Sequence, residues 1–75
     1  IFFKYKFLYF YGMTVRKVLQ ILRKDGWYKV TQRGSHAQYK HPVKKGRVTV
    51  PMHHGDVPVG TLKSIFKQAQ INEKN

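Results

Sequence analysis

The sequence contains no cysteine among its 75 residues. Disulfide bonds and thiolate metal sites are therefore excluded as sources of stability, and no thiol is available as a nucleophile. The absence of cysteine is compatible with a reducing compartment, and we expect a cytoplasmic protein. A chain of this length hides only roughly 60% of the surface that its unfolded form exposes, so we expect one thin domain.

Acidic residues are also scarce, since three Asp and Glu stand against fifteen Lys and Arg and give a formal net charge of +12. Mechanisms based on paired carboxylates, and nuclease sites that hold hard cations through several carboxylates, are therefore nearly excluded. The charge exceeds the magnitude of roughly 2–8 that keeps a small domain soluble. Because such self-repulsion costs stability unless a polyanion offsets it, the charge favours a nucleic-acid partner over a generic basic surface.

Long apolar runs are absent as well, and a membrane span would need about 20 apolar residues. Residues 1–12 are rich in aromatic side chains, but they include Lys4 and Lys6 and lack the cleavage site of a secretory signal. We expect Met13 to be the natural start, with residues 1–12 as an extension and residues 13–75 as the domain. We expect no membrane partner, and the alternative is that the extension lies on a membrane surface.

The spacing of apolar residues predicts a helix at each end of the domain. Thr14 can cap the first helix through its hydroxyl, and Gly26 can end it in the left-handed conformation. A second helix is expected to open at Gly60 or Thr61. The apolar faces are Val15, Val18, Leu19 and Leu22 in the first helix and Leu62, Ile65, Phe66 and Ala69 in the second.

Three strands are expected between the helices, over residues 27–33, 36–41 and 47–50, and residues 52–60 are expected to form a loop. Gly34-Ser35 and Lys44-Lys45-Gly46 are the turns, and connections this short produce an antiparallel meander. The expected fold is α+β in the order α-β-β-β-α, with a three-stranded antiparallel sheet and two helices on one face. This order matches the topology of double-stranded-RNA-binding domains.

Four histidines remain for acid–base chemistry. A zinc site needs about three converging ligands, and the adjacent His53 and His54 point to opposite sides of an extended chain, so we expect no metal and no small-molecule cofactor. RNA permits cleavage without a metal, because its 2′-hydroxyl is an internal nucleophile that a histidine can deprotonate. His36 is the best candidate, since it follows the Gly34-Ser35 turn. The alternative is an ordinary strand-end histidine that caps this turn.

Several segments of the chain resemble the HicA family, the toxins of type II toxin–antitoxin systems. They are Gly26-Trp27, Gln32-Arg33-Gly34-Ser35-His36, Tyr39, His41-Pro42, Thr49-Val50-Pro51, His53, Gly60-Thr61-Leu62-Lys63-Ser64-Ile65 and Lys67-Gln68-Ala69. The resemblance spans residues 14–71. It implies a double-stranded-RNA-binding-like fold, mRNA interferase activity with a catalytic histidine at His36, and a HicB antitoxin that covers the RNA-cutting face. One departure is Gln70, where the family often has glycine.

We expect RNA to be held by basic and polar residues, namely Arg33, Ser35, Lys40, Lys44, Lys45, Arg47 and Lys63. For the Lys44–Arg47 turn the alternative to a phosphate clamp is a solvated hairpin. The start of the second helix can bind phosphate through free N–H groups or be a plain N-cap.

Other aromatic and histidine side chains have competing interpretations. Trp27 and Tyr28 can stack on bases, but an aromatic residue at the start of a central strand more often fills the core. His53 is a candidate second acid–base group or incidental, and His41 is expected to be structural. The leading hypothesis is a metal-independent endoribonuclease toxin that cleaves mRNA. The alternative is a non-catalytic double-stranded RNA-binding module, which needs the same fold and charge but no histidine.

Overall fold

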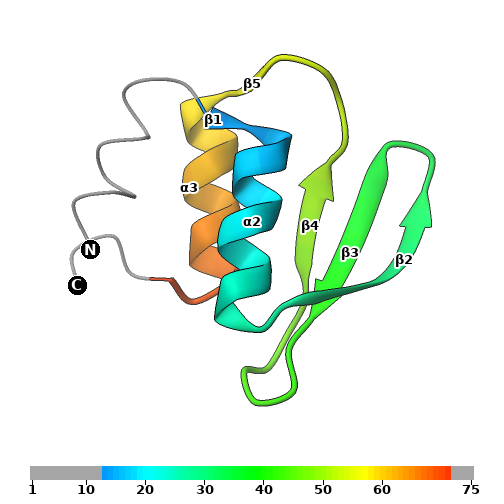
Figure 1. Ribbon diagram of the computed structural model, residues 1–75, viewed down its shortest axis with the longest axis vertical. Helices are drawn as coiled ribbons and strands as arrows, with labels where there is room; N and C mark the ends of the chain where they lie inside the picture. Colours follow the sequence, from blue (N-terminus) through cyan, green and yellow to red (C-terminus); the bar gives the residue numbers. More distant parts are fainter. Residues whose placement is uncertain (1–12, 72–75) are drawn as a thin grey trace.

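The computed structural model describes residues 13–71, which form two layers (Figure 1). Helices α2 (Val15–Asp25) and α3 (Val59–Gln68) cover one face of an antiparallel sheet of order β2-β3-β4. The strands are β2 (Tyr28–Arg33), β3 (His36–Lys40) and β4 (Val48–Pro51). This is the α+β architecture that the sequence predicts. The expectation for residues 1–12 lies outside the described residues.

Helix α2 begins and ends where the sequence predicts. The Thr14 hydroxyl accepts a hydrogen bond from the Lys17 N–H at 3.3 Å, which satisfies one free donor of the first turn. Gly26 ends the helix at a φ of 108°, and its N–H donates to the Arg23 carbonyl at 3.0 Å. A Cβ at position 26 would lie 2.6 Å from His41 Nε2. Glycine is therefore required here both for the backbone conformation and for the space that His41 occupies.

Strand β3 is the central strand, because it pairs with both β2 and β4. Trp27 is 1% exposed, so the prediction that it belongs to the core is confirmed, whereas Tyr28 is 51% exposed and the same prediction for it was wrong. The strand that follows Trp27 is an edge strand, however, and the expectation of a central position was wrong. The meander predicted from the short connections already makes the middle strand central, so the central position assumed for the strand after Trp27 conflicted with that prediction.

The segment over residues 52–60, expected to be a loop, contains the short strand β5 (Asp56–Val57), which pairs antiparallel with β1 (Met13–Thr14). Helix α3 begins at Val59, earlier than predicted, because Pro58 takes the N-cap position with a φ of −58°. The Pro58 carbonyl accepts the Leu62 N–H at 2.9 Å. Gly60 and Thr61 therefore lie inside the first turn, and the helix opens one residue before the earlier of the two predicted starts. No helix within residues 13–71 is long and apolar enough to cross a membrane.

The core lies between the helices and the inner face of the sheet. Its main members are Val18, Ile21 and Leu22 from α2, Leu62, Ile65 and Phe66 from α3, and Ala37, Tyr39, Val48 and Val50 from β3 and β4. Since alternate residues of a strand face opposite sides, burial of Ala37 and Tyr39 places His36, Gln38 and Lys40 on the outer face. None of the described helices covers this outer face (Figure 1).

Candidate active site

His36 is the first residue of β3, directly after the tight turn that joins β2 to β3. Gly34 has a φ of 56°, a conformation that a side chain disfavours, and it lets the chain reverse within two residues. The register pairs His36 with Arg33 on one side and with Pro51 on the other. His36 is exposed, so its imidazole is open to solvent on the helix-free face, as the nuclease hypothesis requires.

The outer face of the sheet is hollowed at His36. The hollow has a volume of about 540 Å³ and is lined by Thr31, Arg33, His36, Gln38 and Arg47. These residues meet because Arg33 pairs with His36 and Thr31 pairs with Gln38, and paired residues of neighbouring strands share a face. None of the lining residues is acidic. The result is an imidazole beside two guanidinium groups with no carboxylate in the lining.

Arg47 enters the hollow from the turn that precedes β4. Its Nη1 donates a hydrogen bond to Gln38 Oε1 at 3.0 Å, which directs the guanidinium across the outer face of β3. A guanidinium carries five donors, so the bond to Gln38 leaves others free for a ligand. Planar guanidinium groups match the geometry of phosphate oxygens. The hollow can therefore hold a phosphate next to the imidazole.

The other basic residues expected to hold RNA are distributed around the molecule. Lys40 is exposed at the far end of β3, on the same face as His36. Ser35 lies in the exposed turn, directly before His36. Lys45 is exposed in the connection between β3 and β4, and Lys63 is exposed on α3, in the layer behind the sheet. The structure thus brings Arg33 and Arg47 to His36 but not the lysines.

Lys44 has an environment that differs from that of a solvated clamp. Its ammonium group forms an ion pair with Asp25 at 2.6 Å and also donates to the carbonyls of Ala69 at 3.2 Å and Gln70 at 3.1 Å. These bonds join the turn before β4 to the last residues of α2 and to the end of α3. Three acceptors already surround this ammonium group, so contact between Lys44 and RNA would require these bonds to break.

His41 holds the same corner of the molecule. Its Nδ1 accepts the N–H groups of Val43 and Lys44, each at 3.0 Å, so its Nε2 carries the proton and donates to the Asp25 carbonyl at 2.6 Å. The imidazole also meets the Trp27 indole edge-on, with ring centroids 5.2 Å apart. Every polar atom of this ring is used inside the protein, which confirms the structural role expected for His41.

The remaining histidines lie in the segment after β4. His53 and His54 are both exposed, and the His53 Nδ1 lies 3.1 Å from the His54 carbonyl oxygen. Among residues 13–71, no three His, Cys, Asp or Glu side chains gather where they could share a metal ion.

Two residues of the hollow were not singled out in the sequence. Thr31 and Gln38 are uncharged, and neither belongs to the segments that resemble a known family. The signal that could have found them is geometric, because Gln38 lies two residues after His36 on the same strand and Thr31 is its partner across the hairpin. Strand alternation combined with the register would have put both beside His36.

Comparison with known proteins supplies the family. The family model described as the HicA toxin of bacterial toxin-antitoxin matches residues 15–71, which is nearly the whole described part of the chain. No curated protein matches the sequence. The matched range runs from the first residue of α2 to just beyond α3 and includes the whole hollow at His36. The chain therefore belongs to the HicA toxin family of toxin–antitoxin systems.

Proposed function

We propose that this protein is a metal-independent endoribonuclease that cleaves mRNA in the cytoplasm with His36 as the general base. One observation carries the proposal: the His36 imidazole is exposed in a hollow that Arg33 and Arg47 also line, on the face of the sheet that none of the described helices covers. Membership of a toxin family supports it, because cleavage of messenger RNA arrests growth. Family and fold alone do not establish an activity, so the site must be tested directly.

The chemistry follows from the groups in the hollow. The His36 imidazole takes the proton of a ribose 2′-hydroxyl, and the 2′-oxygen forms a bond to the adjacent phosphorus while the bond from phosphorus to the 5′-oxygen breaks. The 5′-oxygen takes up a proton from solvent water, so the products are a 2′,3′-cyclic phosphate and a 5′-hydroxyl, and His36 later returns its proton to solvent. The charge that grows on the phosphate oxygens in the transition state is stabilised by the guanidinium groups of Arg33 and Arg47.

RNA binding in this proposal extends beyond the hollow. Ser35 lies next to His36 in the turn, and Lys40 lies at the far end of β3 on the same face. Lys40, Lys45 and Lys63 contribute long-range attraction for the phosphate chain. Because exposed cations neutralise phosphates with release of counterions, affinity for RNA should fall steeply with salt concentration. A HicB-type antitoxin would neutralise the toxin by covering the hollow at His36.

The experiment compares three purified proteins on single-stranded mRNA in the presence of EDTA: the wild type, His36→Ala and His54→Ala. We expect cleavage by the wild type and His54→Ala, with a 2′,3′-cyclic phosphate at the new end. Removal of the general base should slow His36→Ala by roughly 10²–10⁴-fold. His54 is the matched control, because it is exposed and lies outside the hollow.

Two outcomes would overturn this assignment. Equal cleavage by wild type and His36→Ala would remove His36 from the mechanism. Binding of RNA by the wild type without any change in RNA length, at an affinity that His36→Ala shares, would instead support the non-catalytic RNA-binding module. Circular dichroism of each variant distinguishes loss of chemistry from loss of the fold.

A further inference from the structure

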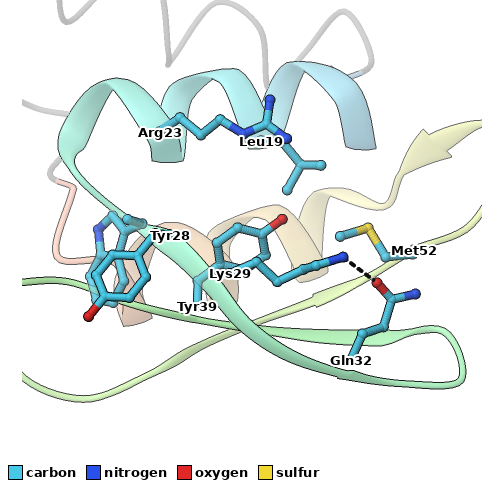
Figure 2. Close-up of a pocket in the computed structure, with 8 residues that line it drawn as sticks. Leu19, Arg23, Tyr28, Lys29, Gln32, Tyr39 and Met52 are labelled. Atoms are coloured by element: carbon cyan, nitrogen blue, oxygen red, sulfur yellow. Dashed lines mark hydrogen bonds between the residues drawn. The ribbon is translucent and has the colours of Figure 1, made fainter.

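Strand β2 has an uncovered inner side. All six of its residues are exposed, although β3 and β4 bury alternate residues against the helices. Between β2 and helix α2 the structure leaves a cleft of about 500 Å³ (Figure 2). This volume lies in the range of roughly 300–1,000 Å³ that small-molecule sites occupy. The cleft is separate from the hollow at His36, and the two share no lining residue.

The lining of the cleft includes aromatic and aliphatic side chains. Trp27 and Tyr39 contribute to the lining but are almost fully buried. Leu19 of α2 and Met52 add aliphatic surface (Figure 2). Tyr28 is 51% exposed and lines the same cleft. Planar heterocycles bind to such surfaces because apolar and aromatic groups stack on their faces.

The rim of the cleft is polar and positively charged. Arg23 of α2 and Lys29 of β2 lie on opposite sides of it, and no acidic residue lines it (Figure 2). Gln32 completes the rim, where its Oε1 accepts the Lys29 ammonium at 2.9 Å and its Nε2 donates to the Gly34 carbonyl at 3.0 Å. Since both ends of the Gln32 amide are engaged, the rim presents mainly donors from Arg23 and Lys29.

The cleft and the hollow lie on opposite sides of one strand. Gln32 lines the cleft, whereas its neighbours Thr31 and Arg33 line the hollow, as expected for alternating side chains. Among the described residues β2 is an edge strand, so no further strand separates the two sites along this edge. A single RNA strand that crosses the edge can therefore place a phosphate in the hollow and a neighbouring base in the cleft.

From this arrangement we infer that the cleft between α2 and β2 binds an unpaired nucleobase of the RNA, next to the phosphate that is cut. The inference rests on the proposed function for the location of the cut phosphate. Guanine fits the rim best, because its O6 and N7 are adjacent acceptors and pair with Arg or Lys donors. The cleft is thus the part of the enzyme that gives cleavage its base preference.

The test uses RNA that cannot be cut, because every 2′-hydroxyl is methylated, and the full-length protein. Trp27 is the single tryptophan of the chain and lines the cleft, so a change in its fluorescence reports a change in the occupancy of the cleft. We expect oligonucleotides containing guanine to change the Trp27 emission. We expect replacement of that guanine by an abasic nucleotide to weaken binding by roughly ten-fold and to remove the emission change.

Two variants change the cleft and one does not. Leu19→Phe fills the apolar part, so the affinity difference between guanine and the abasic nucleotide should disappear. Gln32→Leu releases Lys29 and should reduce the preference for guanine over the other bases. Gln20→Leu is the matched control, since Gln20 is exposed on α2 outside the lining, and it should behave as the wild type. Gln32 is exposed, so its variant keeps the test valid even if Leu19→Phe does not fold.

The outcomes separate this inference from the proposed nuclease. His36→Ala should bind the methylated RNA with the same Trp27 response, because His36 lies outside the cleft. Failure of cleavage with an intact response would therefore reject the nuclease alone. An abasic effect in Leu19→Phe as large as in the wild type, or a preference for guanine in Gln32→Leu as large as in the wild type, would overturn the base site. The base site would also be overturned if Leu19→Phe bound RNA as the wild type does but no longer bound the antitoxin. The cleft would then be a protein-docking surface.

Discussion

Two histidines five positions apart should have effects of very different size on stability when they are replaced by alanine. His41→Ala removes two part-buried hydrogen bonds, those to the Asp25 carbonyl and from the Lys44 N–H, and an exposed one from the Val43 N–H. At about 1 kcal/mol for each part-buried bond and little for the exposed one, the bonds contribute about 2 kcal/mol. The edge-on contact with Trp27 adds about 1 kcal/mol.

The expected loss for His41→Ala is therefore about 3 kcal/mol in the free energy of unfolding. A domain of this size has a total stability of only about 5 kcal/mol, so the variant should keep about 2 kcal/mol and remain mostly folded at room temperature. Urea denaturation followed by circular dichroism measures the free energies of unfolding of the wild type and the variant, and the two can be compared if the slope of the transition is unchanged.

The matched control is His36→Ala, which replaces an exposed histidine with no hydrogen bond recorded to its ring. We expect its stability to stay within about 0.5 kcal/mol of the wild type, because exposed substitutions away from special contacts have small effects. A loss below about 1 kcal/mol for His41→Ala would refute the reasoning from the hydrogen bonds. An equal loss in the two variants would refute the claim that the rings have different roles.

Three further predictions concern the same corner of the fold and the core. Gly26→Ala should lower stability by at least about 1 kcal/mol in urea denaturation, because φ is positive there and the new Cβ would collide with His41. Lys44→Met should lower the free energy of unfolding by about 1–2 kcal/mol, because it removes the ion pair and two hydrogen bonds to carbonyls. Lys45→Met, at an exposed neighbour, should lower it much less. Equal losses in the two variants would contradict the role given to Lys44. Burial raises the pKa of Tyr39 above its usual 10.0, opposed in part by Arg23. A raised pKa in the folded state favours the neutral phenol, so this contribution to stability is complete below pH 10 and is lost as the pH rises through the folded-state pKa. Tyr39→Phe should therefore flatten the alkaline part of a plot of the free energy of unfolding against pH.

Much of the fold could be predicted because its signals are local. Thr14 and Gly26 mark the ends of α2 through hydrogen bonds and dihedral angles that involve only nearby residues. The β2–β3 hairpin follows from Gly34, which sets a tight turn and with it the register that pairs Arg33 with His36. Gln70, noted in the sequence as a departure from the family, adopts a φ of 58°, a conformation that glycine favours.

The features that were missed depend on contacts between distant residues. The β1–β5 pair joins Met13 to Val57 across most of the chain, and two-residue strands have no periodicity to detect. Helix α3 starts at Val59, before the predicted start, because Pro58 takes the N-cap position through its backbone. Composition alone does not distinguish a proline that caps a helix from a proline in a loop.

The features of the candidate site also divide into those that depend on nearby residues and those that depend on distant ones. The sequence by itself determined the positive charge, the α-β-β-β-α order and the exposure of His36 at the end of a turn, because each depends on composition or on neighbours within a few residues. Only the tertiary structure decided that Lys44 is bonded to Asp25 while Arg47 reaches Gln38 beside His36. Both cations come from one turn, and their different roles arise because the helix ends lie near one of them and the open face of the sheet lies near the other.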